Sequence, residues 1–232
     1  MNPASSSKRK RTPAPEAAAP DAGPAAARGG GQTPSIAQNL RKAREAQDLG
    51  LRELSRRVGV SASMISQIER GNVMPSVATL YSIVSELQIS LDDLFSPDGD
   101  RDPGARQSQR EDSGPVLHKP DRNALVLDSG IRWELLTAEP DPNVDFISAS
   151  YPVGSASTAP DRLQRHGGKE YGLVVSGRLG VTVGFETWEM GPGDSISFDS
   201  TQPHRLFCIG SEETQVVWVV VGRHGDTRAL SG

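Results

Sequence analysis

The stretch VGVSASMISQIERGNVMPSVATLYSIVSEL, residues 58–87, decides the fold of the N-terminal half of this 232-residue chain. Ser61 is a natural N-cap for the segment ASMISQIER, because its hydroxyl can accept a hydrogen bond from a free N–H of a first helical turn. Ile65 and Ile68 share the inward face of that helix, and Gly71 can supply the left-handed residue at its end. The pattern predicts a short helix directly after the turn VGVS.

Helical spacing of apolar residues continues on both sides of this stretch. Upstream, it predicts an amphipathic first helix from Ile36 and a second helix, LRELSRRV, that ends at Gly59. Downstream, Ser76 starts a fourth helix, and SLDDLF at residues 90–95 makes a short fifth. Two short helices around a tight turn form the geometry that lays one helix in the major groove of DNA. We therefore expect a five-helix DNA-binding domain.

The helix order and the stretch at residues 58–87 resemble the Cro/phage-repressor-like (XRE) family across residues 36–95. The resemblance implies that the third helix reads bases, where Gln67 can make a two-pronged contact to adenine. It also implies that Arg44 and Glu69 pair as a structural bridge. The two serines of the third helix have a simpler alternative as solvent-facing residues. The DNA-binding residues expected from the resemblance are Arg52, Ala62, Ser63, Ser66, Gln67, Arg70 and Asn72.

Charge is distributed unevenly along the chain. Residues 1–35 carry five basic and two acidic side chains, whereas residues 116–232 carry ten basic and fifteen acidic ones. Residues 41–70 carry seven basic side chains against four acidic ones, so DNA binding is expected in the N-terminal half. Because so few side chains reach bases, one domain should bind weakly, and we expect a homodimer on two half-sites.

Composition predicts four segments. Residues 1–34 are rich in Ala, Pro, Ser and Gly and are expected to be a disordered tail, whose basic run KRKR is either a non-specific DNA arm or a solubilising cluster. The helix-turn-helix domain is expected at residues 35–96. Residues 97–115 hold no aliphatic residue larger than Ala, which is typical of a flexible linker. In residues 116–232 apolar side chains alternate with a period of about two, which predicts an all-β sandwich or barrel.

Two stretches of the C-terminal half resemble the two motifs of the cupin family, HGGKEYGLVVSG at residues 166–177 and GPGDSISFDSTQPH at residues 191–204. The resemblance implies a double-stranded β-helix, or jelly-roll barrel, as the second domain of a multidomain α plus all-β chain. His166, Glu170 and His204 match motif positions. Gln164 stands where a further histidine is usual.

Two histidines and one carboxylate form the facial triad of non-haem iron sites, and the same groups also suit Mn, Ni or Zn. We expect a divalent metal (Fe, Mn, Ni or Zn) on this triad, or an unmetallated pocket lined by the same side chains. Cys208 follows His204 by four residues, so on an unbroken strand it faces the same interior, as core or as pocket. The expected metal ligands are His166, Glu170 and His204. The expected ligand pocket comprises Gln164, His166, Glu170, His204 and Cys208, and further interior candidates are Phe146, Tyr151, Tyr171, Phe198 and Trp218.

A DNA-binding domain, a linker and a small-molecule barrel together resemble bacterial one-component regulators. We expect a transcriptional regulator whose cupin domain senses a small-molecule effector, with no catalytic residues. One alternative is a metal-dependent enzyme, because the same domain order also resembles the iron-dependent 2-hydroxypropylphosphonate epoxidase family. Another is a DNA-binding protein whose barrel only dimerises. The chain has no apolar run of about 18 residues and no apolar signal core, so we expect a cytoplasmic protein without a membrane partner.

Overall fold

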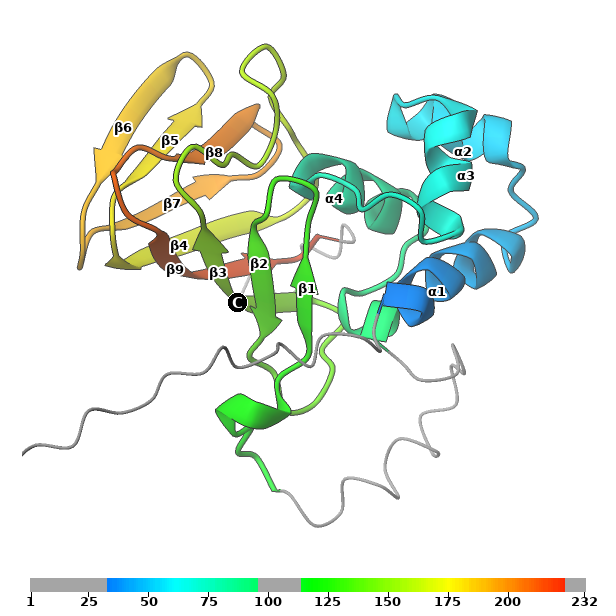
Figure 1. Cartoon of the computed structure of the whole chain (residues 1–232), viewed down its shortest axis with the longest axis horizontal. Helices are drawn as coiled ribbons and strands as arrows, with labels where there is room; N and C mark the ends of the chain where they lie inside the picture. The colour runs from blue at the N-terminus through cyan, green and yellow to red at the C-terminus, as the bar shows by residue number, and fades with distance from the viewer. Residues whose placement is uncertain (1–32, 96–113, 224–232) are drawn as a thin grey trace, which may run out of the picture.

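The computed structural model describes residues 33–95 and 114–223 (Figure 1). Most of the expected tail at residues 1–34 and of the expected linker at residues 97–115 lies outside the described residues. A helical half is followed by a half that consists mainly of β-strands (Figure 1).

Four α-helices form the helical half within the described residues: α1 (Thr33–Glu45), α2 (Leu51–Val58), α3 (Ala62–Glu69) and α4 (Val77–Glu86). The ends of α2 and α3 carry the expected local signals. The Ser61 hydroxyl accepts a hydrogen bond from the backbone N–H of Met64 at 3.1 Å. Gly59 and Gly71 adopt left-handed φ angles of 76° and 70°, a conformation that glycine adopts without the steric cost of a Cβ.

The expected fifth α-helix is wrong, because the segment forms a 3₁₀ helix, η1 (Asp92–Phe95), of four residues. Ser90 and Asp93 cap each other. The backbone N–H of Ser90 donates to Asp93 Oδ2 at 2.9 Å, and the backbone N–H of Asp93 donates to Ser90 Oγ at 3.1 Å. Only one turn fits between this reciprocal cap and Phe95, which is too short for a ladder of α-helical hydrogen bonds.

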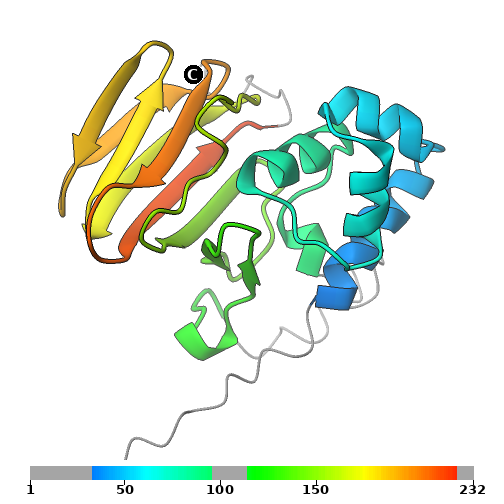
Figure 2. The same ribbon diagram turned by 45° about the horizontal axis from the view of Figure 1, so that its top comes forward.

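The strands lie in two antiparallel sheets that pack as layers (Figure 2). Two isolated bridges, Ala156 with Phe207 and Gln164 with His204, add pairing outside the named strands. Closure of these sheets into a barrel stays a prediction. The six-stranded sheet has the order β1 (Ala124–Val126), β2 (Arg132–Leu135), β3 (Val144–Tyr151), β9 (Thr214–Val221), β4 (Lys169–Ser176) and β7 (Ser195–Asp199). The three-stranded sheet has the order β6 (Glu186–Met190), β5 (Leu179–Val183) and β8 (His204–Cys208). A 3₁₀ helix, η2 (Lys119–Asp121), precedes β1.

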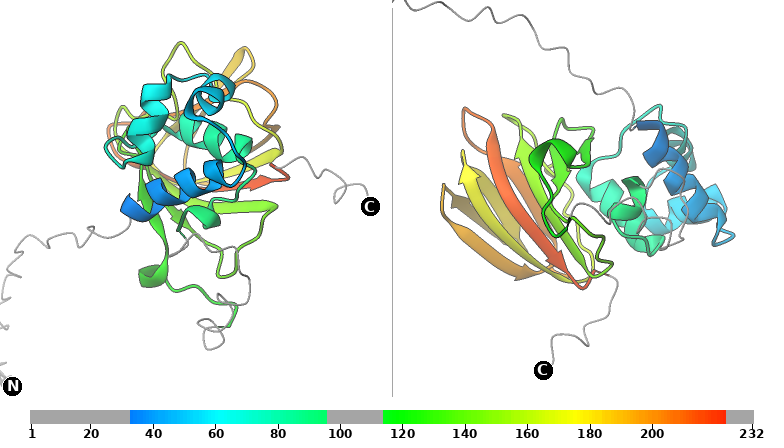
Figure 3. Two further views of the ribbon diagram at one scale, coloured as in Figure 1. Left: turned by 90° about the vertical axis from the view of Figure 1, so that its right-hand side faces the viewer. Right: turned by 90° about the horizontal axis from the view of Figure 1, so that it is seen from below.

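The two halves share one continuous hydrophobic core rather than two separate ones. Tyr81 of α4 packs on Trp133 of β2, with ring centroids 5.2 Å apart. The backbone N–H of Ala78 donates to the carbonyl of Ser157 at 3.2 Å. Helix α4 therefore lies against the strand half, as the view from below also shows (Figure 3), and the segments on either side of it add contacts such as that of Thr137 with Asp92 of η1.

No helix within residues 33–95 and 114–223 has both the length and the apolar character needed to cross a membrane.

Candidate DNA-binding surface and candidate metal centre

Helix α3 presents a mixed face that follows its amphipathic sequence. Ile65 and Ile68 are buried in the helical core, as expected, whereas Ser63 is exposed and Gln67 is half-buried. Gln67 is held from one side, because Asn72 Nδ2 donates to its Oε1 at 2.9 Å. A carbonyl oxygen has two lone pairs, so Gln67 keeps one acceptor site and both amide protons for a base edge.

The other residues expected to contact DNA surround this face. Arg52 of α2 and Arg70 after α3 are exposed, and so is Asn72. Ala62 and Ser66 are half-buried on α3. Of these residues, Gln67 and Asn72 are joined by a hydrogen bond, and contact of the whole set with DNA stays a prediction.

The expected bridge between α1 and α3 is confirmed. Arg44 Nε donates to Glu69 Oε1 at 2.7 Å, and Arg44 Nη2 donates to Glu69 Oε2 at 2.9 Å. A third donor of the same guanidinium, Nη1, reaches the carbonyl of Leu49 at 2.7 Å. The guanidinium therefore fixes α3 to α1 and to the start of the turn before α2, which makes its role structural.

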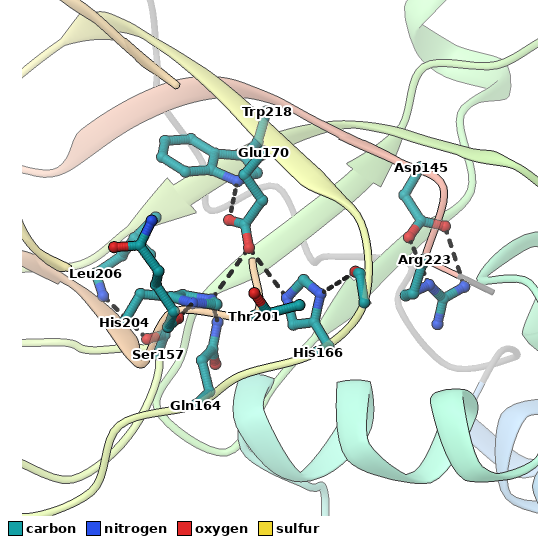
Figure 4. Close-up of polar contacts among 12 residues, drawn as sticks. Asp145, Ser157, Gln164, His166, Glu170, Thr201, His204, Leu206, Trp218 and Arg223 are labelled. Carbon is teal, nitrogen blue, oxygen red and sulfur yellow. Dashed lines mark hydrogen bonds and ion pairs between the residues drawn. The ribbon is translucent and has the colours of Figure 1, made fainter. Parts of the chain in front are cut away.

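The three expected metal ligands converge in the interior of the strand half (Figure 4). Glu170 lies on β4, His204 opens β8, and His166 lies in the loop before β4. Glu170 Oε1 is 3.0 Å from His166 Nε2 and 3.1 Å from His204 Nε2. All three side chains are buried, and their ligand atoms lie within 4.8 Å of one another.

Two glycines bring His166 to this position. An added Cβ on Gly167 would lie 2.6 Å from the carbonyl oxygen of Arg223, and one on Gly168 would lie 2.5 Å from that of Val221. Only glycine therefore lets this loop pass so close to the end of β9. The backbone N–H of His166 then donates to the carbonyl of Ser200 at 3.0 Å, which fixes the loop from its other side.

Backbone carbonyls orient both imidazoles. His166 Nδ1 donates to the carbonyl of Gly167 and His204 Nδ1 donates to that of Gln202, each at 2.9 Å. A neutral imidazole with its proton on Nδ1 presents a lone pair on Nε2, which is the usual arrangement in a metal-ligating histidine. Among the described residues, His166 Nε2 and Glu170 Oε1 have no partner with hydrogen-bond geometry. Electron pairs that face one another in this way suit a cation between them.

The surroundings of Glu170 favour the ionised form of its carboxyl. Burial would raise the pKa of its carboxyl, but hydrogen bonds and positive charge from His166 and His204, when these imidazoles carry a proton on Nε2, outweigh that effect and hold the pKa well below its usual range. The other oxygen, Oε2, accepts the indole N–H of Trp218 at 2.7 Å (Figure 4). The carboxylate is thus charged and fixed in orientation.

Gln164 lies beside the triad, although a histidine is usual at its motif position. Its backbone N–H donates to the carbonyl of His204 at 2.9 Å and its carbonyl accepts from His204 N at 2.8 Å. Its side-chain nitrogen lies 3.0 Å from His204 Nε2, and its Oε1 is buried without a partner among the described residues. Rotation of this amide would turn an oxygen toward the triad, so Gln164 can serve as a weak fourth ligand.

Cys208 faces the interior from β8 but contacts other groups. Its thiol donates to the carbonyl of Glu212 at 3.3 Å and lies 3.4 Å from Thr214 Oγ1. Within the described residues it does not belong to the cluster that can hold a metal ion. Four residues of a strand span about 13 Å, so a shared face with His204 does not imply a shared site. Its place in the ligand pocket stays a prediction.

The aromatic candidates divide between the two faces of the six-stranded sheet. Phe198 lies against His204, with ring centroids 5.0 Å apart, and Trp218 contacts Glu170. Tyr151 is buried. The expectation that Tyr171 faces the interior is wrong, because its side chain is 41% exposed. The expectation that Phe146 faces the interior is also wrong. Phe146 pairs with Val219, and Val219 pairs with Tyr171, so these three side chains lie on the outer face of the sheet.

Sequence reasoning missed a residue that touches the triad from the helical half. The ring of Tyr81 on α4 stacks on the imidazole of His166, with centroids 4.7 Å apart and planes inclined by 17°. It also missed the buried ion pair between Arg223 Nε and Asp145 Oδ2, at 2.9 Å. Neither contact has a spacing signature, because each joins segments that are far apart in the chain.

Two family models match the chain. The model of a helix-turn-helix matches residues 40–94, and the model of a cupin domain matches residues 149–220. The chain combines a helix-turn-helix domain with a cupin domain. The exposed face of α3 belongs to the helix-turn-helix domain, and the cluster of His166, Glu170 and His204 belongs to the cupin domain.

Relatives with both domains are known. The HTH-type transcriptional regulator SutR of Escherichia coli (strain K12) is 25% identical over 179 residues, which are 77% of this chain and 89% of the relative. The HTH-type transcriptional regulator PuuR of the same organism is 24% identical over 168 residues, which are 72% of this chain and 84% of the relative. The similarity therefore extends over the helix-turn-helix and the cupin domain together.

The fold is also similar to solved structures. An HTH_3 family transcriptional regulator from Vibrio cholerae has a TM-score of 0.59 at 23% identity, over 82% of this chain and 96% of that chain, which supports the two-domain fold. The hydroxypropylphosphonic acid epoxidase of S. wedmorenis has a TM-score of 0.40 at 17% identity, over 82% of this chain and 98% of that chain. A likeness that low has no bearing on function.

Proposed function

We propose that this chain is a sequence-specific, DNA-binding transcriptional regulator of the cytoplasm, not an enzyme, whose cupin domain binds a small-molecule effector. The observation that carries the proposal is the union in one chain of an exposed helix α3 and a buried cluster of two histidines and a glutamate. The names of the relatives SutR and PuuR, which span both domains, support it.

DNA recognition is assigned to α3 and its surroundings. Gln67 contacts a base edge, with Ala62, Ser63 and Ser66 beside it, and Arg52, Arg70 and Asn72 hold the phosphates. One such face makes few base contacts, so specificity requires a homodimer whose two copies of α3 meet half-sites about one helical turn apart.

A divalent metal, namely Fe, Mn, Ni or Zn, fits the cupin site. His166, Glu170 and His204 would be its ligands, with Gln164 as a weak fourth and Cys208 further along the pocket. A bound metal supplies open coordination positions that an oxygen or nitrogen group of the effector can take. The chain itself contributes the fixed imidazoles, the charged carboxylate and the exclusion of water from a buried site.

The effector enters between the two sheets. A cavity of about 510 Å³ opens between β6 and β7, and Phe198 on its wall also packs on His204. A pocket of this size accepts a small molecule, and its mostly apolar walls favour a ligand with an apolar portion. The side chains that line it include Val183, Trp188, Met190, Ile196, Phe198 and Gln202.

The DNA-binding part of the proposal is tested with duplexes selected in vitro on the full chain. We expect Gln67→Ala to weaken binding of the selected duplex about tenfold or more, since a two-pronged base contact contributes about 1–3 kcal/mol. Gln215→Ala, an exposed glutamine on β9, is the matched control and should bind as the wild type does. Unchanged binding by Gln67→Ala would contradict the assignment of Gln67.

The metal part is tested by elemental analysis and by titration with Co²⁺, whose absorption spectrum reports histidine and carboxylate ligands. His166→Ala should lose the metal, whereas His118→Ala, an exposed histidine outside the triad, should retain it. Equal metal content in both variants would exclude His166 as a ligand. Turnover of a bound effector in the presence of metal would favour the enzyme alternative, and DNA binding that no effector or metal alters would favour a barrel that only dimerises.

A further inference from the structure

The wall of the metal site behind His166 is supplied by the DNA-binding domain. Tyr81 of α4 stacks on the imidazole of His166 at 4.7 Å on one side and packs at 5.2 Å on Trp133 of the cupin domain on another. The helix passes directly beside His166 in Figure 4. A displacement of the imidazole therefore meets the ring of Tyr81 first.

Tyr81 is held by packing rather than by a hydrogen bond. Its side chain is buried, and its hydroxyl has no hydrogen-bond partner among the described residues. A buried hydroxyl without a partner costs free energy, which a phenylalanine at the same position would avoid. Burial, with the negative charges of Asp145 and Glu170, raises the pKa of this phenol well above its usual value, so Tyr81 stays neutral beside the site.

Two further contacts connect α4 to the cupin domain. At its start, the backbone N–H of Ala78 donates to the carbonyl of Ser157. Ser157 in turn pairs with Leu206, two residues after His204, through its backbone N–H at 2.8 Å and its hydroxyl at 3.1 Å. The first turn of α4 is thus linked to the strand that carries the second histidine.

The contact after the end of α4 involves Arg223. Its Nη2 donates to the carbonyl of Ile89 at 3.2 Å, and its guanidinium pairs with Asp145 on β3. The same guanidinium lies 5.7 Å from the centroid of the Tyr81 ring. This buried ion pair holds the segment after α4 against the cupin domain, so Tyr81 lies between two fixed ends.

The face of α4 next to that of Tyr81 belongs to the helix-turn-helix domain. Leu80 and Val84 are buried in its core together with Leu54 of α2. At the surface, Arg57 Nη1 of α2 lies 3.8 Å from Glu86 Oε2 of α4. One helix of three turns therefore contacts the triad through Tyr81 and packs on the helix-turn-helix domain through a neighbouring face.

We propose that the cupin site is an interdomain site, in which Tyr81 is a positioning residue that links occupancy of the triad to the placement of α4 and so to DNA affinity. The inference rests on the proposed function and deepens it. Close-packed interiors transmit small displacements because they leave no free volume to absorb them. The linkage is reciprocal, so DNA must change the affinity for metal by the same factor by which metal changes the affinity for DNA.

Hydrogen exchange on the wild-type chain tests the path without any substitution. The probe is Zn²⁺ alone, added to the metal-free full chain. We expect a change of exchange rate in the amides of α4, residues 77–86, as well as in those around His166 and His204. Exchange that changes only within the cupin domain overturns the inference, and so does a chain that does not bind Zn²⁺, which would overturn the metal proposal as well.

The role of Tyr81 is tested through the coupling factor, the ratio of Kd values for the selected duplex without and with Zn²⁺. We expect a factor in the wild type that differs from one by about fivefold or more in either direction, within the range usual for allosteric coupling. Tyr81→Phe keeps the stack and should keep the factor. Tyr81→Leu removes the stacked ring and should bring the factor close to one. Phe185→Leu, a fully exposed aromatic in the cupin domain, is the control and should behave as the wild type does.

The possible results distinguish the interdomain coupling through Tyr81 from the proposed function as a regulator. A coupling factor retained in Tyr81→Leu overturns the interdomain path and leaves the regulator intact. Failure of the wild type to bind any duplex overturns both. If Tyr81→Leu does not fold, the exchange experiment and the Tyr81→Phe variant decide, because a factor lost in Tyr81→Phe would contradict transmission through the stacked ring.

Discussion

The indole of Trp218 on β9 donates its N–H to Glu170 Oε2 on β4 at 2.7 Å, across a pair of neighbouring strands. The bond leaves Oε1 for the two histidines. Trp218→Phe removes the indole N–H and leaves the buried Oε2 of Glu170 without this hydrogen bond. We expect the affinity for Co²⁺ to fall about 10- to 100-fold, the usual cost of losing a partner that orients a ligand. Titration followed by visible absorption measures it, and an affinity within twofold of the wild type would contradict this role.

Gly172 makes room for the same indole. It lies opposite Trp218 in the register of β4 and β9, and an added Cβ would fall inside the indole ring. Gly172→Ala should therefore push the indole away from Glu170. We expect a loss of about 1–3 kcal/mol in the free energy of unfolding, as for other overpacked cores, together with weaker Co²⁺ binding.

The matched control for Gly172→Ala is Gly191→Ala. Its added Cβ would lie at an ordinary contact distance of 3.8 Å from Asp194. Urea denaturation and Co²⁺ titration of both variants give the comparison. Equal stability of the two would show that the strand pair adjusts to the extra methyl group.

The triad was predicted from a family resemblance, in which His166, Glu170 and His204 match motif positions, and the structure brings these three side chains together. Glu170 directed inward already requires that Tyr171, the next residue, be directed outward, so the parity rule contradicts the placement of Tyr171 inside. The stack of Tyr81 on His166 has no such rule. It depends on how the two domains pack against each other. That packing is determined by the whole hydrophobic core and not by a local sequence pattern.

The helical half shows the same limit. Caps at Ser61 and Gly71 were predicted because they are local, and the Arg44–Glu69 pair followed from a family resemblance. The linker expected at residues 97–115 gave no prediction of how the two halves pack, whereas α4 is packed against the cupin domain and polar contacts such as that of Ala78 with Ser157 join the two. Contacts between domains follow from shape, which composition does not report.

The buried pair of Arg44 and Glu69 should stabilise the DNA-binding domain only as a pair. Glu69→Ala leaves the buried guanidinium without its two-pronged partner and with only the longer pair to Glu45 at 3.5 Å, and we expect a loss of about 3–5 kcal/mol in the free energy of unfolding. Arg44→Met combined with Glu69→Leu should restore most of it, because the cost of burying two charges disappears with them. Arg41→Ala, which breaks the exposed pair of Arg41 and Glu45, should cost far less. Urea denaturation measures each variant, and additive losses in the double variant would contradict a paired role.

The buried carboxyl of Asp145 should make the free energy of unfolding depend on pH. Burial raises the pKa of its carboxyl, and the attraction of Arg223 does not fully offset that effect. A pKa that is higher in the folded chain than in the unfolded one, where it is about 3.9, favours the protonated form on folding. Its contribution to stability is therefore present below about pH 4 and is lost as the pH rises through the folded value.

Asp145→Asn removes this titration but keeps the shape of the side chain. We expect the free energy of unfolding of the variant, minus that of the wild type, to increase as the pH rises from about 4 toward neutral and then to level off. Asp199→Asn should show the opposite sign, because hydrogen bonds from Thr201 lower the pKa of Asp199 and its contribution is lost as the pH falls below about 4. Urea denaturation between pH 3 and 7 measures both. A difference for Asp145→Asn that decreases with rising pH would show that the pair with Arg223 outweighs the cost of burial.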